Sequence, residues 1–188
     1  FRTSHEINTY TPLDETSLKA LVDESALLEF RQRGLTPDNP VIRGTAQNAD
    51  VYFQGRERSN LFYQHLPVIL EEKMRLLEKL TGRSYHLFDY YGDPQATCVF
   101  IAMGSGSETI QQTVQYLMSK GEKVGMINVH LYRPFSIEFF LKALPISTQK
   151  VIVLDRTKEP GAVAEPLCQD VQAALQMAVA KGLRTTLP

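Results

Sequence analysis

The stretch from residue 97 to residue 132, TCVFIAMGSGSETIQQTVQYLMSKGEKVGMINVHLY, decides the fold of this chain. Residues 97–103 form a continuous apolar run, which is typical of a strand that is buried on both faces. A glycine turn and a helical pattern over 107–121 follow, and residues 123–132 give a second apolar run. A strand, a helix and a second buried strand predict a βαβ unit with parallel strands and a right-handed crossover.

The alternation of strands and helices continues to the end of the sequence. A short helix is expected over 136–144, starting at Ser136. A third strand is expected over 150–155 and a further helix over 164–178. We therefore predict an α/β fold with an open, mainly parallel sheet and flanking helices.

The sequence before the sheet has a different character. Residues 1–12 are irregular, and Asp14 is placed to cap a helix that ends by Gly34. A proline-rich connection follows, and then a long amphipathic helix is expected from about residue 60 to residue 80. Pro67 suits the first turn of the main part of this helix.

The residues around that helix give two more predictions. Gly82 is placed to cap its C-terminus. The segment FQGRE, residues 53–57, sets Arg56 and Glu57 beside Tyr52 and Phe53. We expect the two aromatic rings to be buried and the charged pair to bridge domains.

Composition excludes several classes of protein. The chain has 188 residues, 43% of them hydrophobic, and a net charge of −1, so it lacks the basic excess of a nucleic-acid platform. No apolar run reaches the length of about 18 residues that a membrane span needs. Its two cysteines, Cys98 and Cys168, are too few for a disulfide framework or a four-cysteine iron–sulfur cluster. We expect buried free thiols in a reducing compartment such as the cytoplasm.

The glycine turn is the first candidate binding site. Gly104 and Gly106 match the first two positions of a dinucleotide fingerprint, but Thr109 stands where the third glycine belongs. The turn has no P-loop lysine, and Glu108 in the first helical turn would repel a phosphate. We favour a turn that binds no ligand. The alternative is an anion site built from Gly104, Ser105, Gly106 and Ser107, with Arg133 from the end of the next strand.

Other polar residues point to structure rather than catalysis. Arg133 is more readily explained as a bridge between loops or a contact with a partner. A charged loop after the third strand contains Asp155, Arg156, Lys158 and Glu159, a type of cluster that is usually solvated or interfacial. The four histidines, His5, His65, His86 and His130, have no metal-ligand spacing. We predict no catalytic residue and no metal site, with His130 as a structural histidine.

Several segments resemble one family in order along the chain. They are FRTSHE (1–6), VIRGTAQNADVYFQGRERSN (41–60), LTGRSYHLFDYYG (80–92), LYRPFS (131–136) and VLDRTKEPGAVAEPL (153–167). Together they resemble pyruvate:ferredoxin or flavodoxin oxidoreductase of the long, single-chain, homodimeric type. The resemblance implies that residues 1–45 are the tail of a pyrimidine-binding domain and a linker. Residues 46–182 would then be a domain similar to the C-terminal domain of transketolase, and 183–188 a linker to a following domain.

The resemblance also implies a function for the whole enzyme. The family oxidises pyruvate to acetyl-CoA with thiamine pyrophosphate, Mg²⁺, [4Fe–4S] clusters and coenzyme A, and it passes electrons to ferredoxin or flavodoxin. The family's cofactor motifs lie elsewhere, so this segment is expected to bind none of these cofactors. The first residue, Phe1, is not Met, and we expect a fragment of such an enzyme.

Three hypotheses follow for the chain itself. It is a structural and interface domain without catalytic residues, or a small-anion or nucleotide-binding regulatory module that uses the Gly104–Ser107 turn. A third hypothesis is that it is a separate subunit of a multi-chain oxidoreductase. Its partners are expected to be other domains of the same enzyme and a second copy of it.

Overall fold

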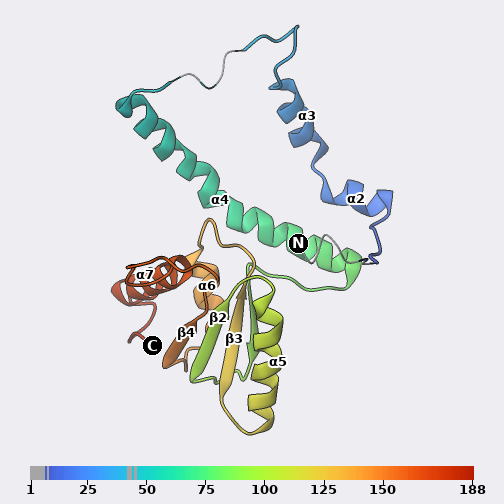
Figure 1. Cartoon of the computed structure of the whole chain (residues 1–188). Helices are drawn as coiled ribbons and strands as arrows, with labels where there is room; N and C mark the ends of the chain where they lie inside the picture. Colours follow the sequence, from blue (N-terminus) through green and yellow to red (C-terminus); the bar gives the residue numbers. More distant parts are fainter. Residues whose placement is uncertain (1–6, 8, 42–43, 45) are drawn as a thin grey trace.

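The computed structural model of the chain describes residues 7, 9–41, 44 and 46–188. The first motif of the family resemblance, residues 1–6 with His5, lies outside the described residues. The described part contains a four-stranded sheet with helices on both faces, preceded by a long helix and two short ones (Figure 1). This arrangement confirms the predicted α/β fold class.

The sheet has the strand order β1-β3-β2-β4. Its parallel strands are β2 (Cys98–Ala102), β3 (Val124–Val129) and β4 (Lys150–Val153), and β2 pairs with both of the others. These are the three strands that the sequence predicts. The edge strand β1 (Phe88–Gly92) runs antiparallel to β3 and was not expected.

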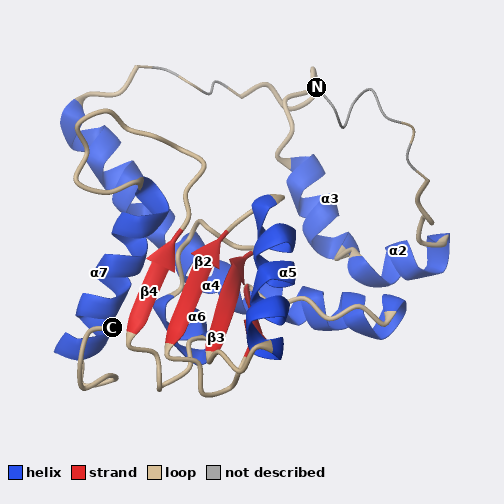
Figure 2. Ribbon diagram, turned by 60° about the horizontal axis from the view of Figure 1, so that its bottom comes forward, coloured by secondary structure: helices blue, strands red, loops and turns tan. Residues whose placement is uncertain are grey.

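Helices lie on both faces of the sheet (Figure 2). Alternating side chains of the strands belong to two different apolar clusters. Phe100 and Met126 face helix α5 (Gly106–Ser119), where they pack with Val114. Ile101 and Ile127 face the larger core on the other side, together with Phe140 of helix α6 (Ile137–Ala143). Helix α7 (Pro166–Ala180) packs into the same core through a set of apolar residues, Leu167, Val171, Ala174 and Leu175.

Helix α4 (Ala49–Thr81) is longer than the sequence predicts. It begins at Ala49 rather than near residue 60, so Pro67 lies inside it and is buried. Its second half packs on the sheet domain through Leu70 and Met74, and it ends at Gly82 in the left-handed conformation with φ of 71°. The predicted glycine cap is therefore confirmed, and the predicted helix start is wrong.

The aromatic residues in the first half of α4 correct a second expectation. Tyr52 is 55% exposed and Phe53 is 65% exposed, although both were expected to be buried. Among the described residues, the sheet domain packs on α4 through the second half of the helix, and no core cluster includes either ring.

Two short helices lie upstream of α4. They are α2 (Glu15–Leu21) and α3 (Glu24–Gln32). Asp14 Oδ1 accepts a hydrogen bond from the Ser17 amide at 2.7 Å, which confirms the predicted cap. A second capping residue, Asp23, accepts from the Ala26 amide at 3.1 Å and so splits the expected single helix in two.

The chain after α7 returns to the sheet domain. The guanidinium of Arg184 is buried and donates to the backbone carbonyls of Pro145, Ile146 and Thr148 at 3.5, 3.3 and 3.1 Å. Residue 184 is thus packed on the loop between α6 and β4. No helix among the described residues has the length and apolar character of a membrane span.

Candidate functional site

The connections at the carboxyl ends of β2 and β3 diverge. β2 leads through the glycine turn to α5 on one face, whereas β3 leads to α6 on the other face. In open α/β sheets, ligands bind in the crevice where neighbouring connections diverge in this way. A cavity of about 430 Å³ opens at this point, and its walls include Gly104, Ser107, Glu108, Asn128 and His130. This cavity is the candidate functional site.

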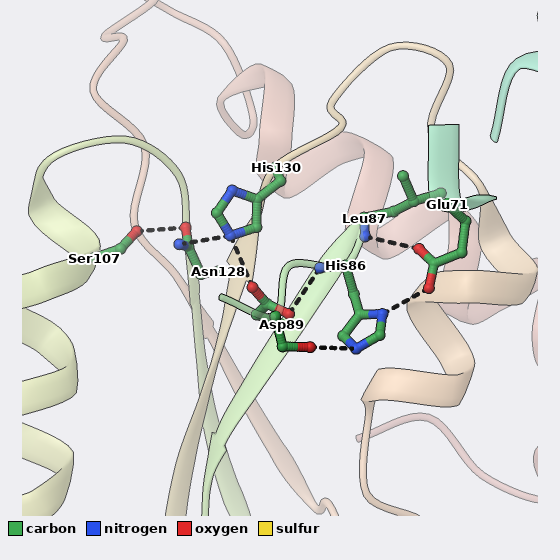
Figure 3. A network of polar contacts seen from close by, with 8 residues as sticks. Glu71, His86, Leu87, Asp89, Ser107, Asn128 and His130 are labelled. Atoms are coloured by element: carbon green, nitrogen blue, oxygen red, sulfur yellow. Dashed lines mark hydrogen bonds and ion pairs between the residues drawn. The ribbon is translucent and has the colours of Figure 1, made fainter. Parts of the chain in front are cut away.

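A chain of polar contacts runs from the cavity to helix α4 (Figure 3). Ser107 Oγ donates to Asn128 Oδ1 at 2.8 Å, and the Asn128 amide nitrogen lies 3.2 Å from His130 Nε2. The same ring nitrogen lies 3.0 Å from Oδ2 of the buried Asp89. These four residues come from α5, β3, the loop after β3 and β1, so the contacts tie four segments together.

The second half of this network anchors α4. The other oxygen of Asp89 accepts from the His86 backbone amide at 3.1 Å. The His86 ring, through Nδ1, lies 2.6 Å from Oε1 of the buried Glu71, and Glu71 Oε2 accepts from the Leu87 amide at 3.3 Å. A carboxylate on α4 is therefore satisfied by the segment that leads into β1.

The arrangement around His130 is unsuited to nucleophilic catalysis. In a Ser–His–Asp relay the carboxylate holds one ring nitrogen and the nucleophile contacts the other. Here Asp89 and Asn128 both contact Nε2 of His130, and Ser107 contacts Asn128 instead of the ring. His130 therefore contacts two polar neighbours through one ring nitrogen, and its structural role stays a prediction.

The glycine turn is also a poor anion site. Gly104 adopts φ of 77°, which explains a glycine there, and the Ser107 amide donates to the Gly104 carbonyl at 3.1 Å. Of the four turn residues of the alternative site, Gly106 does not line the cavity. None of the described residues in its wall is lysine or arginine, and Glu108 adds a negative charge. The four turn residues are adjacent, but Arg133 does not join them.

Arg133 points to helix α7 instead. Its Nη1 lies 2.7 Å from Asp170 Oδ2, and its guanidinium carbon lies 3.9 Å from the centre of the Tyr132 ring. The arginine therefore links the loop after β3 to helix α7, not to a second loop. Burial, together with the hydrogen bond and charge of Asp170, raises the pKa of Tyr132.

The charged loop after β4 is held by contacts within the loop and to α7. Lys158 Nζ lies 2.8 Å from Glu165 Oε1, and this hydrogen bond lowers the pKa of Glu165. Asp155 Oδ2 accepts from the Cys168 amide at 3.1 Å. Burial, with the charges of Asp155 and Glu165, raises the pKa of Cys168, so its thiol is not activated as a nucleophile. Both cysteines are free and partly buried.

Sequence reasoning missed the two buried carboxylates of the network, Glu71 and Asp89. One signal for Glu71 was its position, because it lies four residues after Pro67 and three before Met74 on the buried face of α4. A carboxylate on such a face needs a buried partner. Asp89 gave no comparable signal, because the strand that carries it was not expected.

Comparisons with known proteins agree with the family resemblance. Residues 96–185 match the family model described as pyruvate:ferredoxin oxidoreductase core domain II. Residues 1–75 match the model described as pyruvate flavodoxin/ferredoxin oxidoreductase, thiamine diphosphate-binding. The two models together account for most of the chain, in the order that the resemblance implies.

Curated relatives align with nearly the whole chain. A pyruvate-flavodoxin oxidoreductase of Enterobacter agglomerans is 58% identical over 93% of this chain and 15% of its own length. A pyruvate:ferredoxin oxidoreductase of Moorella thermoacetica is 53% identical over 93% of this chain and 15% of its own length. A probable pyruvate-flavodoxin oxidoreductase of Escherichia coli is 50% identical over 100% of this chain and 16% of its own length. The chain thus spans about 15% of the length of the relatives it matches.

A more distant likeness comes from a solved structure. It is the 2-oxoglutarate:ferredoxin oxidoreductase from Magnetococcus marinus, with 17% identity and a TM-score of 0.44 over 74% of this chain and 22% of that one. The sequence matches decide the family: this chain belongs to the pyruvate:ferredoxin or flavodoxin oxidoreductases.

Proposed function

We propose that this chain is the packing and connecting segment of an enzyme that oxidises pyruvate with coenzyme A. In that reaction pyruvate and CoA give acetyl-CoA, CO₂, one proton and two electrons. The observation that supports this proposal is identity of 50% or more to pyruvate oxidoreductases over almost the whole chain. We propose the finer properties by family resemblance: a homodimer in a reducing, cytoplasmic compartment that transfers electrons to ferredoxin or flavodoxin.

The described residues of this chain fit neither an iron–sulfur cluster nor a bound Mg²⁺ ion. A four-cysteine cluster needs more thiolates than Cys98 on β2 and Cys168 on α7 supply. The described residues contain no group of three His, Cys, Asp or Glu side chains arranged for a metal ion, such as the Mg²⁺ that accompanies thiamine diphosphate. We therefore assign the segment no cofactor and no chemical step. The domain boundaries expected at residues 45 and 182 stay predictions, because the thiamine diphosphate-binding model extends to residue 75 and Arg184 packs on the sheet domain.

A structural role agrees with the site geometry. Ser107, Asn128 and His130 are joined by hydrogen bonds beside the cavity. Asp89 Oδ2 lies 3.0 Å from His130 Nε2 but has no hydrogen bond of its own among the described residues, so its contact with His130 is electrostatic. We propose that this network holds the glycine turn, the sheet edge and α4 in one arrangement.

Variants of the full-length enzyme test this role. Pyruvate-dependent reduction of a viologen dye in the presence of CoA is measured for Ser107→Ala and His130→Gln. Both are expected to keep kcat within about three-fold of the unaltered enzyme, because loss of a general acid or base costs ~10²–10⁴. A hundred-fold loss of kcat in a folded, cofactor-loaded variant would refute the structural role. Absence of pyruvate oxidation by the unaltered full-length enzyme would refute the proposed reaction.

A further inference from the structure

The first half of helix α4 carries apolar residues on several sides. Val51, Tyr52 and Phe53 are consecutive, and successive steps of about 100° around a helix place them on three different sides. Ten residues later the pattern recurs at residues 61–63, Leu-Phe-Tyr. Residues 54–60, QGRERSN, are polar, so the apolar side chains form two separate bands around the helix. An apolar band that encircles a helix is normally buried on all sides.

These side chains are nevertheless exposed in this chain. Phe62 is 79% exposed, Leu61 58% and Tyr63 51%. The half of α4 that carries them extends away from the sheet domain, beyond the buried residues Pro67 and Glu71 (Figure 1). In the described part of the chain, α2 and α3 bury no residue either.

The family models indicate what covers this surface. The model of the thiamine diphosphate-binding domain extends to residue 75, so it includes α2, α3 and all of the exposed half of α4. The model of core domain II begins only at residue 96. Because the chain spans 15% of its relatives, most of the polypeptide that could cover α4 lies outside it.

We propose that residues 49–65 of α4 are packed inside the thiamine diphosphate-binding domain, against polypeptide that precedes this chain in the full-length protein. The second half of α4 is fixed to the sheet domain through Glu71, His86 and Leu87. One continuous helix is then shared by two domains and sets their relative orientation. A second copy of the chain is a poorer occupant, since a two-fold contact covers one side of a helix and not three. The inference rests on the proposed function in one respect, namely that the chain is part of a longer enzyme.

Photo-crosslinking in the full-length protein tests this packing. A benzoylphenylalanine replaces Phe62, or in a second variant Leu61, which lies about 100° around the helix. After illumination, mass spectrometry is expected to find both positions linked to sequence upstream of Phe1 of the same polypeptide. The matched control is Tyr116→benzoylphenylalanine on α5, which is 62% exposed and should not link to that upstream sequence.

Each other result overturns the proposal. A crosslinked dimer would show that a second copy covers α4, and a link to sequence downstream of Pro188 would assign the surface to a different domain. An absence of any crosslink from both positions would show that the helix is exposed in the full-length protein. Pyruvate oxidation by the same sample is measured separately, so that an active but unlinked enzyme refutes only the packing, and a linked but inactive enzyme refutes only the proposed reaction.

Discussion

Glu71 shows how one buried carboxylate fixes a helix to a sheet. Its two oxygens are used by the His86 ring at 2.6 Å and by the Leu87 amide at 3.3 Å. Leu87 is fully buried, so its amide has no access to water if the carboxylate is removed. The contact therefore contributes mainly by preventing an unsatisfied buried donor.

Replacement of Glu71 by alanine is expected to lower the free energy of unfolding by about 1–3 kcal/mol, the cost of a buried group left unpaired. Chemical denaturation measures this change. Glu72→Ala is the matched control, because Glu72 is exposed on the same helix and its loss should change stability by less than about 0.5 kcal/mol. Equal effects of the two substitutions would mean that the Glu71 contacts do not stabilise the fold.

Tyr90 gives a prediction about pH. Its ring covers Gly125, where an added Cβ would lie 2.1 Å from the tyrosine oxygen, and its hydroxyl donates to the Asp93 carbonyl at 2.5 Å. Burial, with the charge of Asp93, raises the pKa of Tyr90 to about 12. Because the folded pKa is above the unfolded value of 10.0, the native state holds this proton more tightly than the unfolded state.

The stability that Tyr90 contributes is complete below its unfolded pKa and is lost as pH rises from about 10 to about 12. The expected loss is about 1–2 kcal/mol, after allowance for partial exposure of the ring. Urea denaturation at a series of alkaline pH values measures it, and Tyr90→Phe should remove this part of the pH dependence. An unchanged pH profile in Tyr90→Phe would contradict the prediction.

The C-terminus of α4 depends on a left-handed residue. Gly82 has φ of 71°, and its amide donates to the Glu78 carbonyl at 2.7 Å. No atom lies within 4 Å of the position where a Cβ would stand, so the cost of a side chain is in the backbone alone. Gly82→Ala is expected to destabilise the chain by about 1 kcal/mol.

Gly55 provides the matched control within the same helix. It too has open space around the Cβ position, and its φ is not in the left-handed region. Gly55→Ala is therefore expected to stabilise the 188-residue chain by up to about 1 kcal/mol, in proportion to helix propensity. Thermal or urea denaturation of both variants tests whether the destabilisation by Gly82→Ala comes from its backbone conformation. If the added methyl group acted through packing, Gly82→Ala and Gly55→Ala would change the stability in the same direction.

The elements that the sequence predicts are those with a simple burial pattern. β2, β3 and β4 are apolar on both faces, and such runs are recognisable without knowledge of their neighbours. β1 was missed because its sequence FDYYG mixes a buried aspartate, two tyrosines and a glycine. It forms a strand because it pairs with β3, and this long-range contact is not visible in the local sequence.

The candidate site shows the same limit. The glycine turn and its departures from phosphate-binding motifs are local, so the sequence alone predicts a turn that binds no ligand. The contact between Asp89 and His130 joins residues 41 positions apart, and no spacing indicates it. The start of α4 was also placed wrongly. Residues 49–60 have no single apolar face, which is the pattern by which a helix is recognised in a sequence.

The described part of the chain contains a sheet domain, a long helix that extends beyond it and two short helices (Figure 1). The network from Ser107 to Glu71 passes through the sheet edge and reaches the middle of that helix. The contacts that hold α4 to the sheet are thus continuous with those in the wall of the crevice at the ends of β2 and β3. This arrangement agrees with the proposed role of the chain as a packing and connecting segment.

Arg184 packs on the sheet domain and therefore indicates where that domain ends. Arg184 is 8% exposed, and its guanidinium donates to three backbone carbonyls of the loop between α6 and β4. Burial lowers the pKa of Arg184. Removal of residues 183–188 leaves those carbonyls without their donor, so it is expected to cost about 1–3 kcal/mol. Removal of residues 186–188 alone keeps Arg184 and should be nearly neutral. Urea denaturation measures the free energy of unfolding of the two truncated chains. A lower value for the chain without residues 183–188 would show that the domain extends to residue 184. Equal values would place the end of the domain at residue 182.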